Sequence, residues 1–110
     1  MKDFTVEFTK LEKKLEVKND MCYNFYYVQY GRIYNADKTQ FRRFKFVFWF
    51  DIFDVMEYFD KDIISHTDII EYANEVAWCT YESYKENIKS FDDCQMFYDW
   101  CNETINNYNK

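Results

Sequence analysis

The chain has 110 residues and a formal net charge of −6, and 24% of its residues are aromatic. This length corresponds to one domain, residues 1–110, that can bury a modest core. With a single glycine, Gly31, the chain cannot build a glycine-rich phosphate-binding loop. No stretch approaches the ~20 uncharged apolar residues of a membrane span, so we expect no membrane segment.

Charge is divided unevenly between the two halves of the chain. Residues 1–50 contain 10 Lys and Arg against 6 Asp and Glu, whereas residues 51–110 contain 4 against 14. The resulting net charges of +4 and −10 sum to the −6 of the whole chain. Segregated charge creates an electric field that acts at a distance, so a charged partner is expected.

The cysteines and the N-terminus indicate a cytoplasmic protein. Cys22, Cys79, Cys94 and Cys101 show neither C-x-x-C spacing nor the density of a disulfide scaffold. The N-terminal MKDFTVEF has no apolar run long enough for a signal peptide. We therefore expect reduced thiols, with Cys94 and Cys101 packed on one face of a helix.

An alternating pattern near the N-terminus predicts a first strand. Phe4, Val6 and Phe8 alternate with polar residues, which is typical of a half-buried strand. After Lys10 the apolar residues change from even to odd positions. If the strand continues, we expect a bulge near Thr9 and Lys10.

Two further strands complete a predicted three-stranded antiparallel meander. Turn residues at 18–20 and 35–38 bound a second strand at about residues 22–34, in which Gly31 indicates a bulge or a close approach of another backbone. The third strand, residues 41–50, places four rings on one face: Phe44, Phe46, Phe48 and Phe50. Burying each ring stabilises the fold by roughly 1.5–3 kcal/mol before entropy is counted, so other elements must cover this face.

The opposite face of the third strand interleaves basic and aromatic residues, namely Phe41, Arg43, Lys45, Val47 and Trp49. Domains that recognise RNA use such a surface to stack unpaired bases. The glycines of their signature are missing here, and the acidic second half would repel phosphates. We therefore expect no direct binding of nucleic acid by this face.

From residue 51 onward the apolar period changes from two to about 3.6, which predicts helices. The first places Ile52, Val55, Met56, Phe59 and Ile63 on its apolar side. The second starts at a cap formed by Ser65 or Thr67 and runs to about residue 89. The third follows Ser90 and turns Cys94, Phe97, Tyr98, Cys101 and Ile105 toward the core. The predicted fold is α+β, a meander packed against two or three C-terminal helices in the order βββααα.

No reaction can be read from this sequence, and we expect neither an enzyme nor a metal or cofactor site. His66 is the only histidine, so a zinc site of the usual His-rich kind cannot form. The carboxylates after residue 50 lie on helix faces turned to water, whereas a general acid needs a carboxyl group shielded by burial.

The remaining signal is a row of acids on the outward sides of the two long helices. On the second helix they are Asp68, Glu71, Glu75, Glu82 and Glu86, with Trp78 beside them. On the third they are Asp92, Asp99 and Glu103, flanked by Trp100. Such a row can be an ordinary solvated face, but solvated faces usually mix charges of both signs.

We predict that these carboxylates imitate nucleic-acid phosphates and occupy the basic groove of a host protein that handles DNA or RNA. Trp78 and Trp100 would fill slots in which bases stack. The alternative is a non-catalytic interaction module, or a homodimer, that uses the exposed Tyr- and Trp-rich surface of the sheet.

In character the chain resembles the small phage and mobile-element inhibitors of host defence, of which anti-CRISPR proteins are the nearest class. The resemblance is carried by the same carboxylates, by the lack of cofactor motifs, and by residue usage typical of an AT-rich genome. It implies an inhibitor of a CRISPR effector nuclease that acts in the cytoplasm of a bacterial host. The basic first half departs from a uniformly acidic mimic, which leaves the Tyr-rich second strand open as the contact surface.

Overall fold

The computed structural model describes residues 3–91 and 94–108 of the chain. Three antiparallel strands come first: β1 (Phe4–Lys18), β2 (Tyr23–Asn35) and β3 (Phe41–Asp51). Three helices follow: α1 (Ile52–Phe59), α2 (His66–Lys85) and α3 (Cys94–Tyr108). The strands pair in the order β1-β2-β3. The predicted α+β fold, an antiparallel meander followed by three helices, is therefore confirmed.

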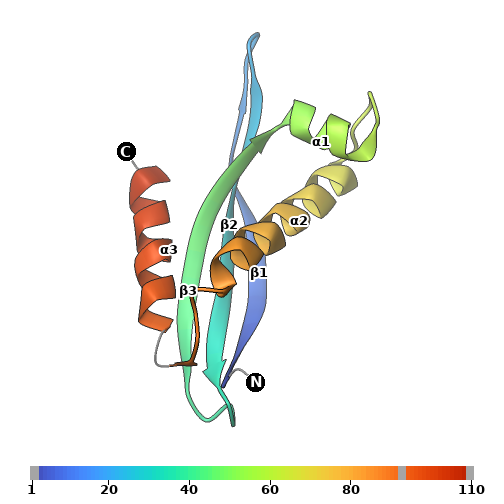
Figure 1. Cartoon of the computed structure of the whole chain (residues 1–110). Helices are drawn as coiled ribbons and strands as arrows, with labels where there is room; N and C mark the ends of the chain where they lie inside the picture. Colours follow the sequence, from blue (N-terminus) through green and yellow to red (C-terminus); the bar gives the residue numbers. More distant parts are fainter. Residues whose placement is uncertain (1–2, 92–93, 109–110) are drawn as a thin grey trace.

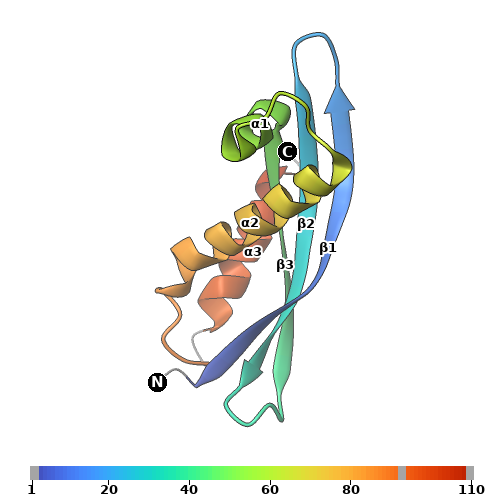
Figure 2. The ribbon, with the colours of Figure 1, turned by 90° about the vertical axis from the view of Figure 1, so that its right-hand side faces the viewer.

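The helices all lie on one side of the sheet (Figure 1, Figure 2). α1 follows directly on β3, α2 crosses the sheet diagonally, and α3 runs alongside β3. None of the helices in the described ranges covers the other side, which Figure 2 shows turned away from them. The sheet therefore has an inner face, packed against helices, and an outer face without that cover.

The predicted row of phenylalanines forms the inner face of β3. Phe44, Phe46 and Phe50 are buried and Phe48 is half-buried, which confirms the expected parity. Across the sheet they oppose β2 residues of the same face, from Gly31 to Tyr27 and Phe25. α2 and α3 complete the core with Ala73, Ala77, Tyr81, Cys94, Phe97 and Cys101.

β1 carries two irregularities where it pairs with β2. The register shifts between Phe8 and Lys10 and again between Lys13 and Leu15. The first shift confirms the bulge predicted near Thr9. The second was not predicted, because polar residues surround it and no change of apolar parity marks it.

The side chain of Gln29, in β2, forms a hydrogen bond to β1 at the first of these irregularities. Gln29 is only 2% exposed. Its Nε2 donates hydrogen bonds to the carbonyl oxygens of Lys10, at 3.0 Å, and Tyr30, at 2.7 Å. The one amide among the rings of the inner face is thus hydrogen-bonded rather than buried without a partner.

Side-chain caps set the starts of α1 and α2. Asp51 caps α1 and Ser65 caps α2, each in a capping box, so the predicted cap at Ser65 is confirmed. α1 ends early because Asp60 adopts a left-handed backbone conformation with φ of 53°. The prediction that this helix includes Ile63 is therefore wrong, and Ile63 is 87% exposed.

Gly31 allows a close approach in the middle of the sheet, as its place in a strand indicated. A Cβ atom added at Gly31 would overlap the ring of Phe44 and lie 2.7 Å from the carbonyl oxygen of Glu7. The Phe44 ring cannot move away freely, because it packs against Phe97 with ring centroids 4.8 Å apart.

Gly31→Ala should lower the free energy of unfolding by about 1–3 kcal/mol, because the added methyl group displaces the Phe44 ring. Urea denaturation of Gly31→Ala, Phe44→Leu and the double variant measures how strongly the two sites are coupled. We expect the double variant to lose less than the sum of the single losses. Strictly additive losses would show that the ring is not the obstacle.

Candidate functional site

Three glutamates of α2 and Glu86, which caps its C-terminus, form an acidic face that points away from the sheet. The members of this acidic face, all exposed, are Glu71, Glu75, Glu82 and Glu86. The buried residues Ile69, Ala73, Ala77 and Tyr81 lie on the opposite side of the helical wheel. At a rise of about 1.5 Å per residue, the acidic face is about 22 Å long. The predicted row therefore exists, with one exception.

The exception is Asp68, whose predicted place in the exposed row is wrong. The residue is only 7% exposed. Its carboxylate accepts hydrogen bonds from the backbone N–H of Ser65, at 3.0 Å, and from Nζ of Lys61, at 3.2 Å. The Ser65 N–H and then Lys61 hold the pKa of Asp68 below its ordinary value. The ionised carboxylate therefore stabilises the start of α2 above about pH 4, and this contribution is lost as pH falls through the lowered pKa.

Two members of the acidic face interact with neighbours on the same helix. Lys85 Nζ lies 2.9 Å from Glu82 Oε2, and the Glu82 side chain remains 55% exposed. The thiol of Cys79 donates to Glu75 Oε1 at 3.5 Å. An exposed ion pair of this kind is weak, so the acidic face keeps most of its negative charge.

The two tryptophans predicted beside the acids differ in their surroundings. Trp78 is 44% exposed and stacks on Phe8 with ring centroids 4.3 Å apart. Trp100 is half-buried and packs against Phe46 at 5.4 Å and Tyr84 at 4.9 Å. Trp100 therefore belongs to the core and, contrary to the prediction, is not available to fill a slot in a partner. Trp78 keeps an accessible surface at the border of the acidic face.

α3 extends the acidic side of the molecule. Asp99 and Glu103 are exposed. Both lie near enough to Tyr84 of α2 to add, after burial and the Cys101 thiol, to the raised pKa of its hydroxyl. The α3 carboxylates therefore lie near the C-terminal end of α2. Asp92, predicted in the same cluster, lies outside the described residues.

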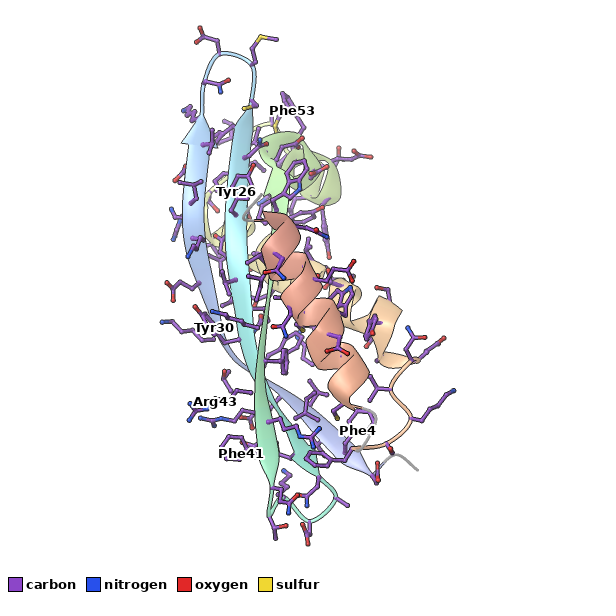
Figure 3. All side chains as sticks on the ribbon, turned by 90° about the vertical axis from the view of Figure 1, so that its left-hand side faces the viewer. Phe4, Tyr26, Tyr30, Phe41, Arg43 and Phe53 are labelled. Atoms are coloured by element: carbon purple, nitrogen blue, oxygen red, sulfur yellow. The ribbon has the colours of Figure 1, made fainter. Side chains whose placement is uncertain are left out.

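The outer face of the sheet is a second candidate surface. All three strands contribute side chains to it, including Lys10, Tyr26, Tyr30, Arg32, Tyr34, Phe41, Arg43, Lys45 and Trp49. Trp49 is 58% exposed and Phe41 is 47% exposed. Figure 3 shows Tyr30, Phe41 and Arg43 pointing away from the helices.

The sequence analysis found the β3 part of this surface but missed Lys10 and Arg32. The pairing of adjacent strands places both residues on this surface: Lys10 opposes Tyr30, and Arg32 opposes Arg43. The alternation within β2 could have placed Arg32 with Tyr30 and Tyr34, since even positions share one face. In β1, the bulge before Lys10 interrupts the alternation of faces, so the same reasoning could not place Lys10.

Ion pairs form within each half of the chain. Residues 1–50 contain the pairs Lys10–Glu12, Lys13–Glu16 and Arg32–Glu7, and residues 51–110 contain Lys61–Asp68 and Lys85–Glu82. The acidic face lies on the helical side, and the outer face carries Lys10, Arg32, Arg43 and Lys45.

The described residues show no grouping suited to metal chemistry. No three His, Cys, Asp or Glu side chains among them converge in a way that could hold a metal ion. Burial raises the pKa of Cys101 to about 12, which keeps this thiol protonated and unreactive at neutral pH.

Comparisons with family models, curated proteins and solved structures find no match to this chain. Within the described ranges, no helix combines the length and the apolar character needed to cross a membrane. The acidic side and the outer face are the two candidate functional surfaces.

Cys79 offers a chemical test of the acidic face, because its thiol contacts Glu75. Burial, and then the hydrogen bond to Glu75, raise the pKa of Cys79, which slows its alkylation at pH values near 8. Glu75→Gln should speed alkylation of Cys79 by iodoacetamide several-fold, whereas the control Glu71→Gln should not. Mass spectrometry of the labelled peptides gives the rate at each cysteine. Equal rates in the two variants, or labelling of Cys101 in the folded protein, would contradict the arrangement.

Proposed function

We propose that this chain is a non-catalytic inhibitor that binds the basic nucleic-acid groove of a host protein, such as a CRISPR effector nuclease. The observation that carries the proposal is the outward row of exposed carboxylates, in which Glu82 pairs only weakly, with the partly exposed Lys85. Its members are Glu71, Glu75, Glu82, Glu86, Asp99 and Glu103. An inhibitor of this class, carried by a phage or mobile element, would act in the cytoplasm of a bacterial host.

In this mechanism the carboxylates imitate the negative charge of nucleic-acid phosphates. A groove that binds nucleic acid is lined with Lys and Arg, and it releases counterions when it meets a polyanion. Carboxylates held on a helix present negative charge in fixed positions, and each can accept a bidentate pair of hydrogen bonds from Arg. Trp78, at the border of the acidic face, offers a ring to a slot that normally stacks a base. Association through such charges is fast and sensitive to salt.

The triple variant Glu71→Lys, Glu75→Lys and Glu82→Lys should lose its partner and keep its fold, because all three side chains are exposed. Affinity capture from a bacterial host lysate, read by mass spectrometry, compares the proteins retained by the variant and by the wild type. The wild type should retain nucleic-acid-handling proteins that added DNA or RNA displaces. Circular dichroism checks that the variant is folded.

A matched control makes the same charge change at exposed acids outside α2, with Asp20→Lys, Glu57→Lys and Asp62→Lys. This control should retain the same proteins as the wild type. The proposal fails if the α2 variant retains them equally well, or if an excess of nucleic acid does not displace them from the wild type.

A second candidate is a contact with another protein, or with a second copy of the chain, through the outer face. One end of that face is apolar. Tyr26 and Trp49 stack there with ring centroids 6.3 Å apart, and Leu15, which opposes Tyr26, is 49% exposed. Exposed rings of this kind commonly form the centre of protein interfaces.

Raising the salt concentration to about 0.5 M separates the two candidates, because salt screens exposed charges and leaves apolar contacts intact. We expect partner binding to be lost at high salt and the chain to sediment as a monomer at low and high salt. Binding, or a dimer, that survives high salt and that Trp49→Ser removes would assign the contact to the outer face.

A further inference from the structure

The half of the outer face distant from α1 carries a basic-aromatic surface. Its members are Lys10, Tyr30, Arg32, Tyr34, Phe41, Arg43 and Lys45. In the strand register, Tyr34 opposes Phe41 and Tyr30 opposes Lys45. Rings and cations from adjacent strands therefore lie next to one another on one exposed face (Figure 3).

The centre of this surface is the exposed ring of Phe41. Two guanidinium groups approach the ring: Arg32 Cζ lies 5.4 Å and Arg43 Cζ 6.0 Å from its centroid. The ring of Tyr34 lies 5.7 Å from that of Phe41. Cation–π contacts hold these side chains in place, and the guanidinium groups keep their positive charge.

Two hollows beside Arg43 bring cations together. The first, with a volume of about 260 Å³, is lined by Lys10, Arg32 and Arg43 around Tyr30. The second, about 430 Å³, lies between β3 and α3, where Tyr30, Arg43 and Lys45 meet Phe44, Cys101 and Asn102. Within residues 3–91 and 94–108, neither Arg43 nor Lys45 forms an ion pair. The first hollow, with its three cations, is therefore the one suited to an anionic group.

We propose that the basic-aromatic surface binds single-stranded nucleic acid. Phosphates lie against Arg43 and Lys45 and against the hollow lined by Arg32, while unpaired bases stack on Phe41 and Tyr30. An uncovered sheet face presents its rings to bases whose faces are free, and the bases of a duplex are already stacked on one another. Single strands are therefore preferred over duplexes.

Charge distinguishes this occupant from a second copy of the chain. A symmetric dimer brings the same patch of both copies together, so the cations of one copy would face those of the other. Two carboxylates lie nearby, with Glu12 2.8 Å from Lys10 and Glu7 4.0 Å from Arg32. Such exposed pairs are weak, so a phosphate can displace them at little cost.

The fold removes the objection that the sequence raised against nucleic acid. α2, whose side opposite its buried residues carries the acidic face, lies on the other side of the sheet (Figure 2). A helix is about 10 Å across, and the Debye length at physiological ionic strength is about 8 Å, so the acidic face is largely screened from a ligand on the outer face. The inference uses a different surface from the proposed function and does not rest on it.

Fluorescence anisotropy at about 0.15 M salt, with a labelled oligo(U) and a duplex of equal length, tests the inference. Arg43→Glu with Lys45→Glu should weaken oligo(U) binding by more than about tenfold, because two phosphate contacts become repulsive. Phe41→Ala should weaken it by about fivefold or more through lost stacking. The control Lys13→Glu with Lys89→Glu makes the same charge change elsewhere and should bind within about twofold of the wild type.

Four results would overturn the inference: no oligo(U) binding by the wild type, equal binding of the duplex, equal losses in the two charge variants, or a dimer that Arg43→Glu with Lys45→Glu dissociates. The α2 variant with Glu71, Glu75 and Glu82 changed to Lys should bind oligo(U) at least as tightly as the wild type. Failure of this inference is therefore distinguishable from failure of the proposed inhibitor function.

Discussion

The burial of the phenylalanine row of β3 is the constraint on which the rest of the structure depends. Each buried ring stabilises the fold by roughly 1.5–3 kcal/mol, a large amount beside the net stability of a small domain. The three helices supply apolar side chains to the inner face, where Phe46 is fully buried. They leave the outer face uncovered. The exposure of Phe41 and Trp49 is therefore a consequence of how the core is closed.

Features that depend on a few neighbouring residues could be predicted from the sequence. A change of apolar parity marked the bulge near Thr9, and the spacing of polar residues marked the cap at Ser65. The errors concern residues whose surroundings come from distant segments or from the exact end of a helix. Asp68 has the wheel angle of the exposed row, yet Lys61 of the preceding loop pairs with it. Likewise the wheel of α3 could not show that another helix lies against Trp100.

The sheet and its helices separate the charge of the chain into two unlike surfaces. The helical side presents carboxylates from α2 and α3, and the outer face presents cations among aromatic rings. The pair Lys85–Glu82 on the helical side and the pairs of Lys10 and Arg32 on the outer face are weak, so both surfaces keep most of their charge. Such a distribution orients the molecule in the field of a charged partner before contact. A single small domain can then offer different chemistry on its two sides.

The hydrogen bonds of Gln29 also bear on how the meander folds. If β1 slipped by one residue along β2, the rings of Phe4 and Phe8, which pack against the core, would turn to the opposite side. The Gln29 amide would lose the Lys10 carbonyl and remain without that partner among the rings, which costs about 1–3 kcal/mol. Only the native alignment avoids both penalties. The side chain of Gln29 therefore favours the native pairing of β1 with β2 over pairings shifted by one residue.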